Sequence, residues 1–213
     1  MKISVLVSGG GTNLQALIDN IENGGIPGVE IVLVISSRGD AFALERARRA
    51  GIKTAIISKK DFPDEAILAR ELGRALEAAE TELVVLAGYM HVLHPAVIKK
   101  YRGRIINIHP SLIPKYCGKG FYGMRVHRAV IEAGEKVSGA TVHFVDEGVD
   151  TGEIILQREV PVLDGDDEST LAARVLEVEH IILPEAIRMF FNLKLKTSYD
   201  KLSLRLSKKC VTK

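Results

Sequence analysis

The sequence predicts one α/β domain with a mostly parallel central sheet, helices on both faces of that sheet and an antiparallel extension. Short apolar runs alternate with amphipathic runs over roughly the first 110 residues, which is typical of repeated β-α-β units. The apolar runs are rich in Val, Ile and Leu, as expected of parallel strands buried on both sides. Together with a change of rhythm near residue 137, these features indicate a Rossmann-like fold.

The first β-α-β unit is the clearest. KISVLVS at 2–8 predicts a strand, LQALIDNI at 14–21 predicts a helix that ends at NGG, and EIVLVIS at 30–36 predicts a second strand. The pattern then repeats. The later elements are expected as a helix around 41–51, a strand at 53–58, a helix around 64–79, a strand at 82–88, a short helix after His94-Pro95 and a strand at 103–109.

The C-terminal part has a different pattern. Residues 137–162 hold two strand-like runs joined by a turn rich in Gly and Asp, which predicts the antiparallel extension. A final helix is expected at roughly 168–190, so a single domain should span residues 1–193 without a linker. Residues 194–213 carry seven Lys or Arg against Asp200 alone, a formal charge of +6. Leu alternates with polar residues in this tail, which favours a closing hairpin or a solvated end over a basic arm for nucleic acid.

The composition is that of a water-soluble globular protein: of 213 residues, 46% are hydrophobic and 26% are charged. Cys117 and Cys210 are too few for a disulfide framework or a zinc site, and free thiols suit a reducing compartment. No signal peptide precedes the first strand, and no apolar run is long enough to span a membrane. We therefore expect a cytoplasmic protein, with monomer and homodimer both left open.

The segment SGGGTN, residues 8–13, connects the first strand to the first helix, where backbone N–H groups and the helix dipole attract an anion. Thr12 and Asn13 add side-chain donors. The dinucleotide fingerprint is absent, because Leu14 stands where its third Gly belongs and the second strand ends SSRG without an acid. The loop therefore favours a phosphate monoester on a small substrate. The alternative is a glycine turn that only makes a tight corner.

Asn107 and His109 end the strand at 103–109, at the carboxyl edge of the sheet where open α/β folds place ligands. Residues i and i+2 of a strand face the same side, and Pro110 and Pro114 stiffen the loop that follows. An amide can donate to an oxyanion, and an imidazole can exchange protons near neutral pH. The pair therefore suits acyl transfer, although Asn107 could instead cap the loop and His109 could be a packed core residue.

A third group is needed to tune His109, and the segment DEGVDTGE offers Asp146, Glu147 and Asp150. The residue pattern alone does not choose among these acids. An ionised partner stabilises imidazolium and raises the pKa of the His, which would give a proton donor for a leaving amine.

Four segments, SGGGTN, LAGYMHVL, NIHPSLIP and VDEGVDTG, resemble the glycinamide ribonucleotide formyltransferase family in order and spacing. The resemblance covers about residues 1–190 and implies the formyltransferase fold. That family transfers the formyl group of 10-formyltetrahydrofolate to the amine of glycinamide ribonucleotide in purine biosynthesis. The resemblance thus implies these two small-molecule substrates, with no metal and with neither nucleic acid nor membrane as a partner.

The resemblance also assigns residues. It makes Asn107 the oxyanion-binding amide, His109 the general acid and Asp150 the catalytic carboxylate. The other roles that it implies are the substrate phosphate for Gly11, Thr12 and Asn13; the ribose or glycinamide end for Glu179; the folate for Met90, His91, Val92 and Leu93 together with Asn107; and support of the catalytic group for His143.

Two departures from the family pattern stand out. His91 replaces an Arg that many members carry, and the segment 115–127 is several residues longer than usual. Cys117 in that segment could act as a nucleophile with His109 as base, but no orienting Asn or Asp is evident. HVLH at 91–94 lacks the carboxylate or Cys that would complete a metal-binding spacing.

Three other functions compete with this interpretation. Methionyl-tRNA formyltransferase shares the Asn, His and Asp but usually adds a C-terminal RNA-binding domain, whereas only about twenty residues follow the expected last helix. Formyltetrahydrofolate hydrolase normally has an additional N-terminal domain, whereas this chain begins with the first strand. A non-catalytic nucleotide- or RNA-binding module would fit the fold and the basic tail, but it has no need of an Asn-His-Asp set.

Overall fold

The computed structural model describes the backbone of residues 1–210 and the side chains of residues 1–195. The elements, in chain order, are β1 (Lys2–Val7), α1 (Thr12–Glu22), β2 (Glu30–Ser36), α2 (Phe42–Arg49), β3 (Thr54–Ile56), α3 (Glu65–Ala78), β4 (Leu83–Leu86), α4 (Pro95–Lys100), β5 (Ile105–His109), α5 (Met124–Glu132), β6 (Val137–Phe144), β7 (Ile154–Pro161) and α6 (Glu168–Cys210).

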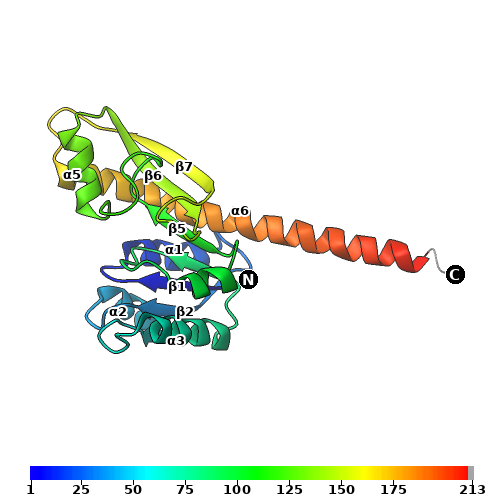
Figure 1. Cartoon of the computed structure of the whole chain (residues 1–213). Coiled ribbons are helices and arrows are strands. Elements are labelled where there is room, and N and C mark those ends of the chain that lie inside the picture. Colours follow the sequence, from blue (N-terminus) through cyan, green and yellow to red (C-terminus); the bar gives the residue numbers. More distant parts are fainter. Residues whose placement is uncertain (211–213) are drawn as a thin grey trace.

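One seven-stranded sheet organises the chain, with strand order β3-β2-β1-β4-β5-β6-β7 (Figure 1). Strands β1 to β5 are parallel, and β6 and β7 add antiparallel pairings. The predicted fold class is confirmed, including the antiparallel extension. The strand order changes direction at β1 and β4, and open α/β sheets bind ligands at such a switch point, beyond the carboxyl ends of the strands.

The hydrophobic core lies on both faces of the sheet. In β1, Ile3, Val5 and Val7 pack with the cluster that includes apolar residues of α1 and α6, whereas Leu6 packs with the cluster of α3 and α4. This alternation follows the period of two in a strand, and both sets of side chains are fully buried. The apolar strands predicted a sheet that is buried on both faces, and helices do cover both faces.

Helix α5 was not predicted from the sequence. Its buried residues are His127 and two apolar residues that lie one turn apart, Val126 and Val130. Only nine residues long, and preceded by a glycine-rich segment, the helix presents too short a periodic pattern to stand out. The helix includes the end of the lengthened segment 115–127, and β6 of the sheet follows it.

For residues 194–213 the sequence left a closing hairpin and a solvated end open, and the hairpin is wrong as far as Cys210, because α6 continues to that residue (Figure 1). Leu, Lys and Arg favour helix, and extending an existing helix avoids the cost of nucleation, so the Leu-polar alternation did not produce strands. At the start of this segment Lys194 forms an ion pair with Glu82, next to β4.

The domain boundary predicted at residue 193 falls within α6, and residues 211–213 lie outside the described part of the chain. No helix in that part is both long enough and apolar enough to cross a bilayer.

Candidate active site

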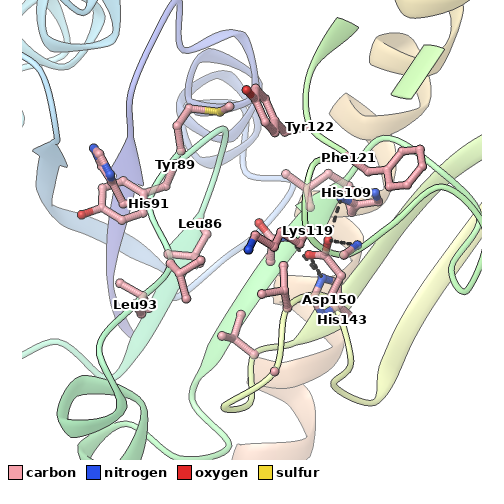
Figure 2. A pocket seen from close by; sticks show the side chains of 18 of the residues that line it. Leu86, Tyr89, His91, Leu93, His109, Lys119, Phe121, Tyr122, His143 and Asp150 are labelled. Carbon is pink, nitrogen blue, oxygen red and sulfur yellow. Dashed lines mark hydrogen bonds and ion pairs between the residues drawn. The ribbon is translucent and has the colours of Figure 1, made fainter. Parts of the chain in front are cut away.

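A pocket of about 340 Å³ lies beyond the carboxyl ends of β4 and β5 (Figure 2). Its walls come from residues 88–93 after β4, 107–110 at the end of β5, 118–123 before α5, and 145–146 and 148–150 after β6. Asn107, His109, His143 and Asp150 all line it, as do Met90 to Leu93, which together with Asn107 are expected to contact folate. The structure thus brings together the predicted catalytic set and the predicted folate segment.

His109 is the last residue of β5, and it is only 4% exposed. Its Nε2 lies 2.9 Å from the carbonyl oxygen of Tyr116. Because a carbonyl only accepts, Nε2 carries a hydrogen and the ring orientation is fixed. Nδ1 faces Asp150 Oδ2 at 3.6 Å. The proton that His109 gains or loses is therefore the one on Nδ1, on the side of the carboxylate.

Burial lowers the pKa of His109, and this outweighs the opposing effects of the Asp150 charge and the Tyr116 carbonyl, with His143 lowering the pKa further. The expectation that an acidic partner would leave this pKa raised is therefore wrong in its net direction. Asp150 does act as expected, but a ring this deeply buried loses more from desolvation of its charged form. His109 is consequently mostly neutral at pH 7.

Asn107 and His143 are directly opposed in the antiparallel pairing of β5 with β6. His143 Nδ1 donates to the Phe144 carbonyl at 2.8 Å, so the Nε2 of a neutral ring accepts from Asn107 Nδ2 at 3.1 Å. An amide nitrogen carries two hydrogens, so Asn107 keeps a second donor for another acceptor. His143 thereby fixes the direction in which Asn107 can donate.

Asp150 sits in the turn between β6 and β7 with φ of +57°, and its side chain is 12% exposed. Its Oδ2 accepts from the Gly118 N–H at 2.9 Å, and its Oδ1 lies 3.6 Å from His143 Nε2. Burial alone would raise the pKa of this carboxyl, but His143, His109 and the Gly118 N–H together hold it below its usual value. Asp150 is therefore ionised at neutral pH.

The other two acids of this turn are placed differently. Asp146 accepts from the Gly148 N–H and the Thr151 hydroxyl, so it serves the turn itself. Glu147 is exposed and does not line the pocket. Of the three acids that the residue pattern left open, Asp150 is the one that lies against His109.

The glycine loop precedes α1, which begins at Thr12. Gly11 has φ of +72°, and a Cβ at this position would lie 2.5 Å from that of Ala43, so only glycine fits. Asn13 is 8% exposed, and its Nδ2 donates to Glu179 Oε2 at 2.6 Å. Asn13 was expected to donate to a phosphate, but one hydrogen of its amide group is directed toward α6 instead.

Glu179 is also 8% exposed, and burial raises its pKa to about 7 despite the bond from Asn13. Neither Glu179 nor residues 11–13 line the pocket. The glycine loop is nevertheless joined to the pocket wall, because the Met90 N–H donates to Ser8 Oγ at 2.9 Å. The predicted phosphate site and the predicted folate segment are therefore neighbours that remain distinct.

Sequence reasoning missed three groups around these sites. Arg46 of α2 donates to the Gly10 carbonyl at 2.8 Å and to Gln15 Oε1 at 3.1 Å, and so holds the glycine loop. The Tyr116 carbonyl and the Gly118 N–H position His109 and Asp150. The last two are backbone groups, which no residue pattern reveals, and Arg46 belongs to no motif.

The remaining reactive side chains have structural partners. The Cys117 thiol donates to the Pro114 carbonyl, and its pKa is raised by burial and then by Asp150, which disfavours the thiolate that a nucleophile needs. His94 Nδ1 caps α4 by accepting from the Ala96 N–H. Within the described residues, no group of three or more His, Cys, Asp or Glu could hold a metal ion.

Comparisons with known proteins identify relatives over most of the chain. The profile of the formyl transferase family matches residues 1–187. Phosphoribosylglycinamide formyltransferase of Escherichia coli (strain K12) is 44% identical over 196 residues, which cover 92% of this chain and 90% of that protein. The crystal structure of glycinamide ribonucleotide transformylase 1 from Symbiobacterium toebii superposes with a TM-score of 0.84 at 46% identity, covering 89% of this chain and 87% of that one.

A longer relative shows the same similarity in one of its parts. Trifunctional purine biosynthetic protein adenosine-3 of Drosophila pseudoobscura pseudoobscura is 50% identical over 190 residues, or 88% of this chain. The chain spans only 14% of the length of that relative. On the evidence of the matched profile, the shared fold and the level of identity, this chain belongs to the formyl transferase family.

Proposed function

We propose that this protein transfers the formyl group of 10-formyltetrahydrofolate to the amine of glycinamide ribonucleotide, a step of purine biosynthesis. The observation that carries the proposal is the convergence of Asn107, His109 and Asp150 on one pocket wall. Support comes from the names of the E. coli and Symbiobacterium relatives, whose sequences match along nearly their whole length. These substrates and the residue roles below are our proposal for this chain.

The folate would lie in the pocket against residues 90–93, and glycinamide ribonucleotide would place its phosphate at residues 11–13. The bond between the Met90 N–H and Ser8 joins the glycine loop to the segment expected to hold the folate, which supports neighbouring sites for the two reactants. Glu179 would meet the ribose or glycinamide part. Holding two reactants together in this way removes much of the entropic cost of a bimolecular step.

The reaction begins when the substrate amine attacks the formyl carbon, and the formyl oxygen gains negative charge. The free N–H of Asn107 donates to this oxyanion. His109 is mostly neutral beforehand, but the new negative charge adds to that of Asp150 and favours imidazolium. His109 thus gains its charge as the tetrahedral intermediate forms, and its Nδ1–H contributes a second stabilising charge.

Collapse of the intermediate breaks the bond between the formyl carbon and N10 of the folate. The amine loses one proton and N10 gains one, so the relay through His109, with Asp150 ordering a water, leaves the enzyme unchanged. The products are formylglycinamide ribonucleotide and tetrahydrofolate. No step requires a metal or a covalent intermediate, and a cytoplasmic location would fit these substrates.

The acceptor identifies the activity. The protein is mixed with 10-formyltetrahydrofolate in three separate reactions, which contain glycinamide ribonucleotide, methionyl-tRNA or no acceptor. The release of tetrahydrofolate is followed in each. Turnover only with glycinamide ribonucleotide supports the proposal. Turnover with methionyl-tRNA or without any acceptor would replace it with one of the two related activities, and no turnover at all would favour a binding module.

A further inference from the structure

Lys119 is the only Lys or Arg among the residues that line the pocket. It belongs to the lengthened segment 115–127 and is exposed at the pocket rim. Within the described part of the chain, no hydrogen bond or ion pair engages its ammonium group. The pocket thus has one positive charge without a protein partner.

The loop fixes the position of this residue next to the catalytic carboxylate. The Gly118 N–H donates to Asp150 Oδ2, and the positive φ values of Gly118 and Gly120, +84° and +97°, set the path of the backbone on either side. Phe121 packs edge-on against Tyr116, whose carbonyl binds His109. Figure 2 shows the Lys119 side chain among the residues that line the pocket.

The acidic side chains of the pocket already have other partners. Asp150 faces His109, His143 and the Gly118 N–H, and Asp146 is bonded to Gly148 and Thr151. Much of the rest of the pocket lining is apolar or aromatic and includes Tyr89, Val92 and Tyr122. A cation on such a rim suits a ligand with a flat apolar body and an anionic end.

The anionic end that Lys119 would bind is not the phosphate of the other substrate, because the site predicted for that phosphate, residues 11–13, does not line this pocket. The folate co-substrate has an aromatic body and a glutamyl tail with two carboxylates. We propose that Lys119 binds a carboxylate of this glutamyl tail and so favours glutamylated folates. This inference rests on the proposed function and adds a specificity-determining residue to it.

The test is isothermal titration calorimetry of the full chain with tetrahydrofolate and with tetrahydropteroate, which lacks the glutamyl tail. Lys119→Gln should weaken tetrahydrofolate binding roughly three- to tenfold, as expected for loss of a partly exposed charged hydrogen bond. It should leave tetrahydropteroate binding within about twofold, and Lys119→Arg should restore most of the affinity for tetrahydrofolate. Lys136→Gln, which removes the same charge outside the pocket, should match the wild type for both ligands.

Three outcomes would overturn the inference. Equal weakening of both ligands would mean that Lys119 acts on the pocket as a whole. Unchanged tetrahydrofolate binding would mean that Lys119 does not bind the glutamyl tail. Failure of the wild type to bind tetrahydrofolate would overturn the proposed function as well. The first two outcomes would overturn only the role of Lys119, so the two kinds of result can be told apart.

Discussion

Asn107 and His143 face each other across strands β5 and β6, and the Asn107 amide donates to the His143 ring at 3.1 Å. The other ring nitrogen of His143 is bonded to the Phe144 carbonyl at 2.8 Å. The backbone of β6 therefore sets the ring, the ring sets the amide, and the amide presents its remaining hydrogen to the pocket. In the proposed mechanism, this chain of bonds would let His143 position Asn107, and Asn107 would contact the substrate.

Asn107→Ala should lower kcat for formyl transfer by about 10²-fold or more, the usual effect of removing one oxyanion donor. Steady-state kinetics with glycinamide ribonucleotide and 10-formyltetrahydrofolate would measure it. The exposed Asn192→Ala in α6 serves as the control and should behave as the wild type. A near-normal rate for Asn107→Ala would remove this residue from the mechanism.

His143→Ala should reduce kcat roughly tenfold, because Asn107 would lose one hydrogen bond that holds its orientation. His143→Gln should recover part of this loss, since a Gln carbonyl can accept from Asn107 in place of the ring nitrogen. Comparing kcat of the two variants separates positioning from simple destabilisation. Equal losses in both would argue against the proposed role.

Asp150→Asn should lower the pKa of His109 further, because removing a negative charge at 3.6 Å disfavours imidazolium. Titration of the imidazole resonances by NMR would report the change directly. The same variant should also lose activity, since His109 would gain its proton less readily during attack. An unchanged His109 titration would show that the carboxylate does not tune this ring.

Glu179→Gln should stabilise the fold increasingly as pH rises. The folded pKa of Glu179 is raised to about 7 from the ordinary 4.5, so its contribution to stability is fully present below pH 4.5 and is lost as pH rises through 7. The variant does not titrate, so its advantage should grow by on the order of 3 kcal/mol over this window. Its amide can also donate to Asn13 Oδ1, which has no partner within the described residues.

Urea unfolding at pH 4.5 and pH 8 measures this difference. The exposed Glu177→Gln, on the same helix, removes the same type of side chain outside the buried site and is the control. A Glu179→Gln advantage that is the same at both pH values would mean that the carboxyl is not held protonated by burial.

Much of the fold follows from local pattern. The β-α-β units and the antiparallel pair carry periodic apolar runs, and such runs report burial directly. The continuation of α6 was missed because the alternation of Leu and polar residues after residue 193 also fits a strand. Helix α5 was missed because it is short.

The site was predictable only where side chains carry the chemistry. Asn107 and His109 were found as a pair at a strand end, but the bond from Asn107 to His143 depends on the register of β5 against β6. The placement of His109 depends on the Tyr116 carbonyl, and its lowered pKa depends on burial, which outweighs the Asp150 charge. These are tertiary effects that no spacing in the sequence encodes.

Formyl transfer to glycinamide ribonucleotide can be tested by following the formyl carbon itself. The protein is incubated at neutral pH with glycinamide ribonucleotide and 10-formyltetrahydrofolate labelled with ¹³C in the formyl group, and the label is followed by NMR. We expect the label to appear in the formamide of formylglycinamide ribonucleotide, at a rate that Asn107→Ala lowers by about 10²-fold. Release of the label as formate, or its retention in the folate, would show that the protein does not catalyse this transfer.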